Sequence, residues 1–302
     1  MSLGLETSVQ SSRVLRDEPM SKHTSWRVGG PADLFFRPGT VAELKEFLQK
    51  LPADVPLTWI GLGSNVLVRD GGIRGAVVCT SALPREIERI DETRVHAGAG
   101  VPCATLARRC VRWGLGPAAF FAGIPGTMGG ALAMNAGAFG GETWDNVESV
   151  ETIDRAGTVR QRQRSEFGIG YRSVTGAGDQ WFLGATLHFA RGRIDDAANM
   201  RRLLDKRSDS QPLGRPSAGS VFRNPPGDHA GRLIEAAGLK GAREGGAMVS
   251  DKHANFIINS DAATARDIEA LIGRIRAEIG RRFGVELEPE VRILGEAAEA
   301  GS

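Results

Sequence analysis

The chain has 302 residues, a formal net charge of +2 and 41% apolar residues, which is enough for two or three compact units. The near-balanced charge predicts no broad nucleic-acid surface. Because no apolar run reaches membrane-spanning length and no signal-peptide core occurs, we expect a cytoplasmic protein without a membrane or nucleic-acid partner.

The N-terminal part is predicted to combine short strands with one helix. The first ordered segment is expected over 24–37, with a strand at 34–36. Thr40 and Glu43 form a capping-box pattern, after which apolar residues follow at helical spacing. Strands are expected at 57–60, 66–68 and 76–79, and the first of these leads directly into the sequence GLGSN.

This GLGSN loop, Gly61–Asn65, does not fit the dinucleotide-binding fingerprint. That fingerprint needs a third glycine and a following helix, whereas Val66 occupies the glycine position and β-branched residues follow. The chain also has no P-loop sequence. A strand–loop–strand that offers glycine, serine and asparagine to a ligand fits the pattern, and so does a plain tight turn.

A glycine-rich stretch, Gly123–Gly141, follows a strand at 94–98 and a helix expected from Pro102 to Trp113. Seven of its nineteen residues are glycine, and no charged residue occurs from Gly116 to Gly141. Glycine lets the backbone approach a ligand closely, and successive N–H groups form anion sites. We favour a phosphate-binding loop; the alternative is a buried helix of small residues, which fits 131–134.

The C-terminal half is predicted to begin with a hairpin over 147–163 and a strand at 181–189. A helix at 197–209 and a link at 211–216 lead to the loop SAGSVFRNP at 217–225. A short helix at 232–237, a strand at 253–259, an amphipathic helix over 268–283 and a final strand at 285–294 complete the pattern.

Few residues outside the glycine loops indicate chemistry. The five histidines are scattered without metal-ligand spacing, and no G-x-S-x-G motif occurs. Cys79, Cys103 and Cys110 form no CxxC motif and are expected to be reduced core residues. Three polar sites are left: Arg172, Ser220 and Glu290. Each also fits an ordinary role, as an exposed arginine, a turn-capping serine and an edge-strand or buried acid.

The ordered set of motifs resembles the MurB family, UDP-N-acetylenolpyruvoylglucosamine reductase. The resemblance runs from about Thr24 to Gly295 and is specific as a set. It is carried by TSWRVGGPADLFF, GLGSNVLVRDGG, GIPGTMGGALAMNAGAFG, GYRS, SAGSVFRNP, KHANFIIN and LEPEVRILG.

The resemblance implies an α+β fold. It has an FAD-binding domain of the vanillyl-alcohol-oxidase (PCMH) type at 20–196, with two α/β lobes that split near 80, and a C-terminal α/β substrate-binding domain at 210–296. The implied cofactor-binding residues lie in the two glycine loops: Gly61, Gly63, Ser64, Asn65, Gly123, Ile124, Pro125, Gly126, Thr127, Asn135 and Gly137.

The family reaction uses FAD and NADPH. NADPH reduces FAD, and the flavin then delivers hydride to the double bond of UDP-N-acetylglucosamine enolpyruvate, giving UDP-N-acetylmuramate for peptidoglycan. By resemblance, Ser220 donates the proton, while Arg172 holds the substrate carboxylate and Glu290 acts with it. Asn224, Arg292 and Tyr171 match positions near the nucleotide-sugar, and no metal is implied.

One departure concerns the tyrosine-bearing lid of one family branch. Tyr171 is the sole tyrosine and belongs to the GYRS motif, so the chain resembles the branch without that lid. We expect Arg223, His253 or Phe256 to contribute to the nucleotide's cover instead. Two alternatives are a flavin enzyme that oxidises a small alcohol and a non-catalytic nucleotide-sugar binder.

Overall fold

The computed structural model describes residues 13–191 and 197–298. This part of the chain divides into two compact units. The first contains 13–15, 34–62, 75–191 and 197–206, and the second contains 16–33, 63–74 and 207–298. The predicted division at 20–196 and 210–296 differs from these units at 16–33 and 63–74, which group with the C-terminal residues. The assignment of a function to each predicted domain stays a proposal.

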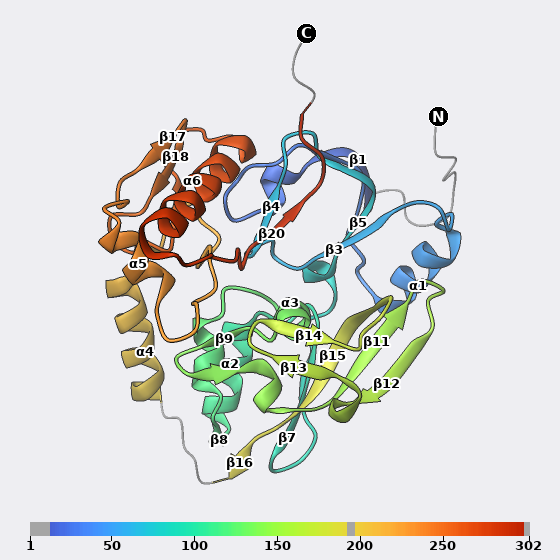
Figure 1. Cartoon of the computed structure of the whole chain (residues 1–302). Coiled ribbons are helices and arrows are strands. Elements are labelled where there is room, and N and C mark those ends of the chain that lie inside the picture. Colours follow the sequence, from blue (N-terminus) through green and yellow to red (C-terminus); the bar gives the residue numbers. More distant parts are fainter. Residues whose placement is uncertain (1–12, 192–196, 299–302) are drawn as a thin grey trace. The chain divides into compact units, whose positions relative to one another are not determined.

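The first unit contains an antiparallel five-stranded sheet in the order β12-β11-β15-β7-β6 (Figure 1). Its strands are β6 (Ile87–Arg89), β7 (Arg94–Gly98), β11 (Val147–Asp154), β12 (Val159–Gln163) and β15 (Gln180–His188). Helices α2 (Cys103–Arg112) and α3 (Met128–Met134) share one buried core with this sheet. The predicted hairpin over 147–163 is therefore confirmed as β11–β12.

Helix α1 (Val41–Lys50) begins as the capping box predicts. The Thr40 hydroxyl accepts the Glu43 N–H at 3.1 Å, and the Glu43 carboxylate accepts the Gly39 N–H at 2.8 Å. The helix buries Leu44, Phe47 and Leu48 in a second core of this unit. Because its ends and its apolar face both follow from the local sequence, this helix could be predicted from sequence alone.

A further sheet has the order β1-β2-β5-β3, formed by β1 (Val14–Pro19), β2 (Pro31–Phe36), β5 (Ile73–Cys79) and β3 (Leu57–Ile60). The first ordered segment was expected at residue 24, but β1 begins ten residues earlier, at Val14. The sequence VLRDEP of β1 is mostly exposed and lacks the apolar alternation that indicates a strand. Its pairing with other strands, rather than its own pattern, makes it a strand.

Short paired strands complete the first unit: β8 (Leu115–Gly116) with β16 (Ala190–Arg191), β9 (Gly137–Ala138) with β10 (Gly141–Glu142), and β13 (Gly168–Gly170) with β14 (Ser173–Thr175). Short 3-10 helices of this unit cover Thr80–Ala82, Ala119–Gly123, Thr143–Asp145 and Arg164–Glu166, and a further one, Met20–His23, belongs to the second unit. Helix α4 spans Ala197–Ser210, close to its predicted bounds.

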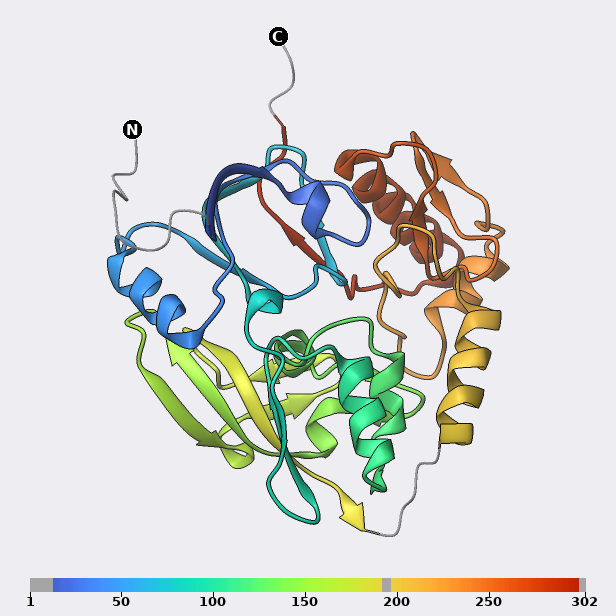
Figure 2. The ribbon, with the colours of Figure 1, turned by 180° about the vertical axis from the view of Figure 1, so that it is seen from behind.

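The second unit packs two helices against short strands. Helix α6 (Ala265–Phe283) lies against β17 (Arg243–Glu244) and β18 (Ala247–Val249), which continue into β19 (Ile257–Asn259); Figure 2 shows this group from behind. Helix α5 spans Ala230–Ala236. The core of this unit also contains Trp26, Val28 and Leu67, which lie far away in the sequence.

Segment 63–74 joins this unit through strand pairing and a helix cap. Strand β4 (Val66–Val68) pairs in parallel with β20 (Arg292–Leu294). The two carboxylate oxygens of Asp70 accept the N–H groups of Ala265 and Arg266, each at 2.9 Å. The N–H groups in the first turn of a helix have no acceptor within the helix, so Asp70 stabilises the start of α6.

Two predicted strands are much shorter than expected. The prediction of a strand over 253–259 is wrong for its first half, because β19 begins only at Ile257. The prediction over 285–294 is wrong until Arg292, where β20 begins. Apolar residues are buried in both places, but the chain there does not form a continuous strand ladder. It is held by turn hydrogen bonds and, at Pro289, by an isolated bridge to Phe222. Within the described residues, no helix combines the length and apolar character that crossing a membrane requires.

Candidate functional site

Gly61 and Thr127 bring the two predicted glycine loops together within the first unit. A Cβ atom built at Gly61 would lie 2.9 Å from the Thr127 hydroxyl oxygen. This hydroxyl belongs to a residue that is only 1% exposed, and it has no hydrogen-bond partner within residues 13–191 and 197–298. A buried hydroxyl without a partner is costly, so the Gly61–Thr127 pair fits a polar ligand group that approaches across Gly61.

Main-chain bonds occupy several amides of the loop 123–129. The N–H groups of Ile124, Gly126, Met128 and Gly129 donate to carbonyls of Phe121, Ile124, Val101 and Ala99, at 2.8–3.1 Å. The predicted nest of N–H groups is thus partly used to hold this loop in place. Residues Gly123, Ile124, Pro125 and Gly126 lie beside Thr127 in the chain, and their cofactor contacts stay a prediction.

Several glycines of the stretch 123–141 are needed for packing. A Cβ atom at Gly123 would lie 2.5 Å from the Phe139 ring, and one at Gly141 would lie 2.8 Å from the Phe120 ring. Gly63 has a positive φ of 65°, and a Cβ atom there would collide with the His23 carbonyl. Glycine in these loops therefore reports close internal packing as well as a ligand.

Asn135 is engaged in structural bonds at the end of α3. It has a left-handed φ of 47° and is 1% exposed. Its side-chain amide donates to Glu142 Oε2 at 2.7 Å and to the Gly170 carbonyl at 3.0 Å, while its Oδ1 accepts the Trp144 N–H at 3.1 Å. These bonds favour a structural role for its side chain, and its predicted cofactor contact has no support from them.

Arg172 is fixed against the same end of α3. Its Nη1 donates to the Asn135 carbonyl at 3.3 Å, and its Nη2 donates to the Gly137 carbonyl at 3.0 Å. The guanidinium lies 5.1 Å from the centroid of the Tyr171 ring, which is 47% exposed. Arg172 also has a left-handed φ of 52°. The first unit thus brings together four predicted site residues: Arg172, Tyr171, Asn135 and Gly137.

In the second unit, Ser220 lies in a segment that is bonded on both sides. Its neighbour Val221 donates its N–H to the Asn255 carbonyl at 2.9 Å, and the Val221 carbonyl accepts the Glu290 N–H at 2.7 Å. Gly219, with a φ of 71°, provides the turn before Ser220. These bonds place the main chain at Ser220 and at Glu290 in neighbouring segments.

Asn65 connects the GLGSN loop to the segment that carries Glu290. Its side-chain Nδ2 donates to the Glu290 carbonyl at 3.1 Å, and its own carbonyl accepts the Arg292 N–H at 3.0 Å. Asn224 caps α5, because its Oδ1 accepts the Ala230 N–H at 3.1 Å. The second unit therefore gathers Asn65, Ser220, Asn224, Glu290 and Arg292, five of the predicted residues.

Sequence alone did not predict that Asn255 and His253 hold the segment that follows Ser220. Asn255, 4% exposed, makes three hydrogen bonds with the segment that follows Ser220. His253 accepts the Asn255 N–H on Nδ1 at 3.2 Å, and burial, followed by the nearby Lys240 charge, lowers the pKa of its imidazole. The sequence signal was the amide of Asn255 in the apolar run HANFIIN, because a buried amide needs partners.

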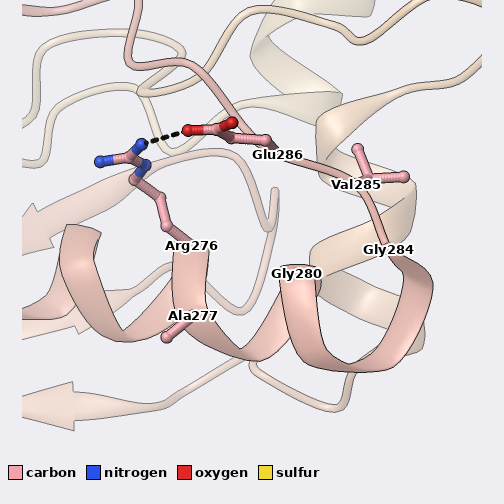
Figure 3. Close-up of a pocket in the computed structure, with 6 residues that line it drawn as sticks. All are labelled: Arg276, Ala277, Gly280, Gly284, Val285 and Glu286. Atoms are coloured by element: carbon pink, nitrogen blue, oxygen red, sulfur yellow. Dashed lines mark hydrogen bonds and ion pairs between the residues drawn. The ribbon is translucent and has the colours of Figure 1, made fainter.

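Two of the three cysteines contact the glycine loops: Cys79 Sγ donates to the Gly61 carbonyl at 3.6 Å, and the Cys103 N–H donates to the Gly126 carbonyl at 2.9 Å. Cys103 and Cys110 are free and buried, and burial raises the pKa of each thiol to about 12, so the prediction of reduced core residues is confirmed for them. Cys79 is likewise free and buried. A hollow of about 410 Å³ at the end of α6 is lined by Arg276, Ala277, Gly280, Gly284, Val285 and Glu286 (Figure 3).

That hollow contains none of the predicted site residues. The Arg276 guanidinium donates to Glu286 Oε1 at 3.1 Å (Figure 3). It also donates to the Leu287 carbonyl at 3.0 Å. Within the described part of the chain, no group of three or more His, Cys, Asp or Glu side chains is arranged to hold a metal ion. The Gly61–Thr127 pair and the Ser220–Glu290 segments are therefore the candidate site features.

The comparisons with known proteins first define a class. A family model described as "FAD binding domain" matches residues 32–162, which include both Gly61 and Thr127. The chain is thus an FAD-binding protein, and the Thr127 hydroxyl, which has no hydrogen-bond partner within the described residues, is consistent with that cofactor. A second family model, described as "UDP-N-acetylenolpyruvoylglucosamine reductase, C-terminal domain", matches residues 211–294.

The chain belongs to the UDP-N-acetylenolpyruvoylglucosamine reductase (MurB) family. It is 55% identical over 296 residues to the reductase of Alkalilimnicola ehrlichii, covering 98% of this chain and 99% of the relative. It is 56% identical over 286 residues to that of Methylococcus capsulatus, covering 94% and 93%.

The crystal structure of MurB from Thermus caldophilus matches with a TM-score of 0.80 and 34% identity, covering 94% of this chain and 99% of that one. The predicted fold class, an FAD-binding domain plus a C-terminal domain with mixed helices and strands, is confirmed.

Proposed function

We propose that this chain reduces UDP-N-acetylglucosamine enolpyruvate to UDP-N-acetylmuramate with NADPH, as a cytoplasmic step of peptidoglycan precursor synthesis. The observation that carries the proposal is the bonding of the Ser220 segment to the Glu290 segment. Support also comes from the reductases of Alkalilimnicola ehrlichii and Methylococcus capsulatus, which match nearly the whole chain. In this proposal, the predicted domain at 20–196 binds the cofactor and that at 210–296 binds the substrate.

The residues proposed to hold FAD begin with Gly61 and Thr127. Gly61 approaches the Thr127 hydroxyl closely. This hydroxyl has no hydrogen-bond partner within the described residues, and we propose that it bonds a pyrophosphate oxygen. Gly63, Ser64 and the loop 123–127 are proposed to line the same cofactor. The chemistry that bound FAD supplies is the transfer of a hydride from NADPH to the enolpyruvyl double bond.

The proposed reaction adds a hydride and a proton across one carbon–carbon double bond. As hydride adds to the methylene carbon, negative charge develops on the carbon that bears the carboxylate. Arg172 bonds that carboxylate and stabilises the charge. The Ser220 hydroxyl then donates its proton to this carbon, which forms the new C–H bond, and solvent returns a proton to the serine oxygen.

Glu290 and three further residues complete the proposed substrate site. Glu290 acts with Arg172 by polarising the double bond through hydrogen bonding, and the bond between the Glu290 N–H and the Val221 carbonyl keeps the Glu290 segment beside the Ser220 segment. Asn224, Arg292 and Tyr171 are proposed to contact the nucleotide-sugar. Tyr171 presents an exposed ring that could stack on a flat group of the ligand.

The proposal is tested by separating the two half-reactions in the Ser220→Ala variant. A yellow preparation that is bleached by NADPH and recoloured by the enolpyruvyl substrate is the expected result for the unchanged protein. We expect Ser220→Ala to keep flavin reduction and to slow recolouring by roughly 10²- to 10⁴-fold, the usual contribution of a positioned proton donor. A colourless protein that takes up no FAD, or equal losses in both half-reactions, would contradict the proposal.

A further inference from the structure

We propose that Asn255 positions Ser220 for proton delivery and that His253 holds Asn255 in place. The inference rests on the proposed function, because it assigns a role in the substrate half-reaction. Neither side chain is required to touch the substrate. The two residues lie in the turn before β19, in the same unit as Ser220.

Asn255 acts on the two residues that follow Ser220. Its Oδ1 accepts the Phe222 N–H at 2.9 Å, its Nδ2 donates to the Phe222 carbonyl at 2.8 Å, and its own carbonyl accepts the Val221 N–H at 2.9 Å. The side-chain amide thus takes the place of a neighbouring strand residue, which would offer the same donor and acceptor. Three bonds fix the chain direction just after Ser220.

The opposite edge of this segment is bonded to the Glu290 segment. The Val221 carbonyl accepts the Glu290 N–H, and the Arg223 N–H donates to the Glu288 carbonyl at 2.9 Å. Residues 221–223 therefore lie between Asn255 on one edge and residues 288–290 on the other. Within the described residues, Asn255 is bonded to residues 221 and 222 and not to residues 288–290 in this arrangement. A shift of Asn255 would therefore move the main chain next to Ser220 relative to Glu290.

His253 fixes the turn that presents Asn255. Its Nδ1 accepts the Asn255 N–H at 3.2 Å, and a nitrogen that accepts carries no proton. This bond requires the neutral imidazole with its proton on Nε2. The ring is restrained by an edge contact with Phe256, at 4.8 Å between centroids.

The experiment compares three variants of the full-length holoenzyme. His253→Ala removes the acceptor for the Asn255 N–H. His253→Asn keeps an acceptor, because the Oδ1 of asparagine is two bonds from Cβ, like the Nδ1 of histidine. Asn255→Asp keeps the shape but replaces the donor to the Phe222 carbonyl by an oxygen. Each variant is measured by flavin reduction with NADPH, by reoxidation with the enolpyruvyl substrate, and by hydrogen exchange of the peptide 217–225.

We expect the defect to be confined to reoxidation. Misplacement of a catalytic group costs up to roughly 100-fold, so Asn255→Asp should slow reoxidation by roughly 10- to 100-fold and His253→Ala by less. Flavin reduction and KM for the substrate should change by less than about twofold, because neither residue binds it in this inference. Hydrogen exchange at 217–225 should rise in both variants, and His253→Asn should restore exchange and rate together.

Other results would overturn the inference in distinguishable ways. A raised KM with an unchanged reoxidation rate would make His253 a direct contact of the nucleotide instead. Equal loss of both half-reactions in the variants would mean general damage to the fold. Failure of the unchanged protein to be reoxidised by the enolpyruvyl substrate would remove the proposed function. The exchange data would then still report whether Asn255 and His253 order the segment 217–225.

Discussion

Arg172 and Ser220 are held by opposite means, although each follows a glycine-containing turn and each is proposed to act on the substrate. The Arg172 guanidinium donates to the carbonyls of Asn135 and Gly137, so Arg172 is held in place by hydrogen bonds of its own side chain. Ser220 is held through the main chain of Val221. The difference teaches that removal of Arg172 changes both fold and chemistry, whereas removal of the Ser220 hydroxyl changes the chemistry alone.

The largest expected effect comes from Arg172→Ala. Two hydrogen bonds are lost and two carbonyls lose a charged donor, so we expect a loss of about 1–3 kcal/mol in unfolding free energy. Loss of the proposed carboxylate contact should also slow reoxidation by at least about 100-fold. Denaturant unfolding and stopped-flow reoxidation measure the two effects separately.

The matched variant Arg172→Gly separates the side chain from the backbone. Arg172 has a φ of 52°, where a residue with a Cβ is strained by about 1–2 kcal/mol relative to glycine. The glycine variant should therefore be more stable than Arg172→Ala but equally slow. Ser220→Ala should change the unfolding free energy by less than about 0.5 kcal/mol. A destabilised Ser220→Ala would break the contrast between the two residues.

A smaller effect on reoxidation is expected from Asn65→Asp, which tests the hydrogen bond from Asn65 to the Glu290 carbonyl. The change places a carboxylate oxygen against the Glu290 carbonyl, where Nδ2 now donates at 3.1 Å. We expect a loss of about 1–3 kcal/mol in unfolding free energy and a clear slowing of reoxidation. FAD content per chain is measured as well, since Asn65 was predicted from sequence to bind the cofactor.

Asn259→Asp is the control for this change. Asn259 also donates its Nδ2 to a distant carbonyl of the same unit, that of Trp26, at 3.0 Å. Both variants should lose similar stability, but only Asn65→Asp should slow reoxidation. If Asn65→Asp loses FAD and shows a normal rate per bound flavin, its role is cofactor binding instead.

The smallest expected effect is a dependence of stability on pH that comes from His253. Burial, then Lys240, lowers its pKa from the ordinary 6.5, while Glu235 acts in the opposite direction. Between the lowered pKa and 6.5, the unfolded chain binds more protons than the folded chain. Unfolding free energy should therefore fall as pH falls below about 6.5.

The His253→Asn variant isolates this contribution. Unfolding is measured from pH 5 to pH 8 for both proteins, and the variant should lose less stability toward pH 5. An identical pH dependence in the two proteins would show that His253 does not take up a proton on unfolding. The range stays above the region where carboxylates such as Asp228, whose pKa is about 2 because of the Arg232 bond, begin to be protonated.

The sequence predicted those helices whose capping residues and apolar faces can be recognised from neighbouring residues alone. Helix α1 has its capping box, and helix α6 has an apolar face with Thr264 before it and Gly284 after it. The family motifs also identified Ser220, Glu290 and Asn65, three residues that the second unit gathers. Sequence and structure agree for the two helices because the determining contacts are local, whereas the site roles of Ser220, Glu290 and Asn65 stay predictions.

The rest depended on partners far away in the chain. The cofactor contact of Asn135 stays a prediction, and its side-chain bond to the Gly170 carbonyl, 35 residues away, had no signal in the local sequence. The strand expected from His253 was wrong because the His253 Nδ1 accepts the Asn255 N–H and turns the chain. Asn255 bonds Phe222, which lies 33 residues earlier. No local pattern encodes such pairings, so only the folded arrangement reveals them.

The cap that Asp70 provides for α6 bears on how the protein is made. Asp70 and Ala265 are separated by 195 residues, so at about 5–20 residues per second the partner is synthesised roughly 10–40 s later. Over that interval, Trp26, Val28 and Leu67 have been made, while most of the core that buries them has not. The emerging chain therefore carries apolar surface that a chaperone can recognise, and the second unit can be completed only near the end of translation.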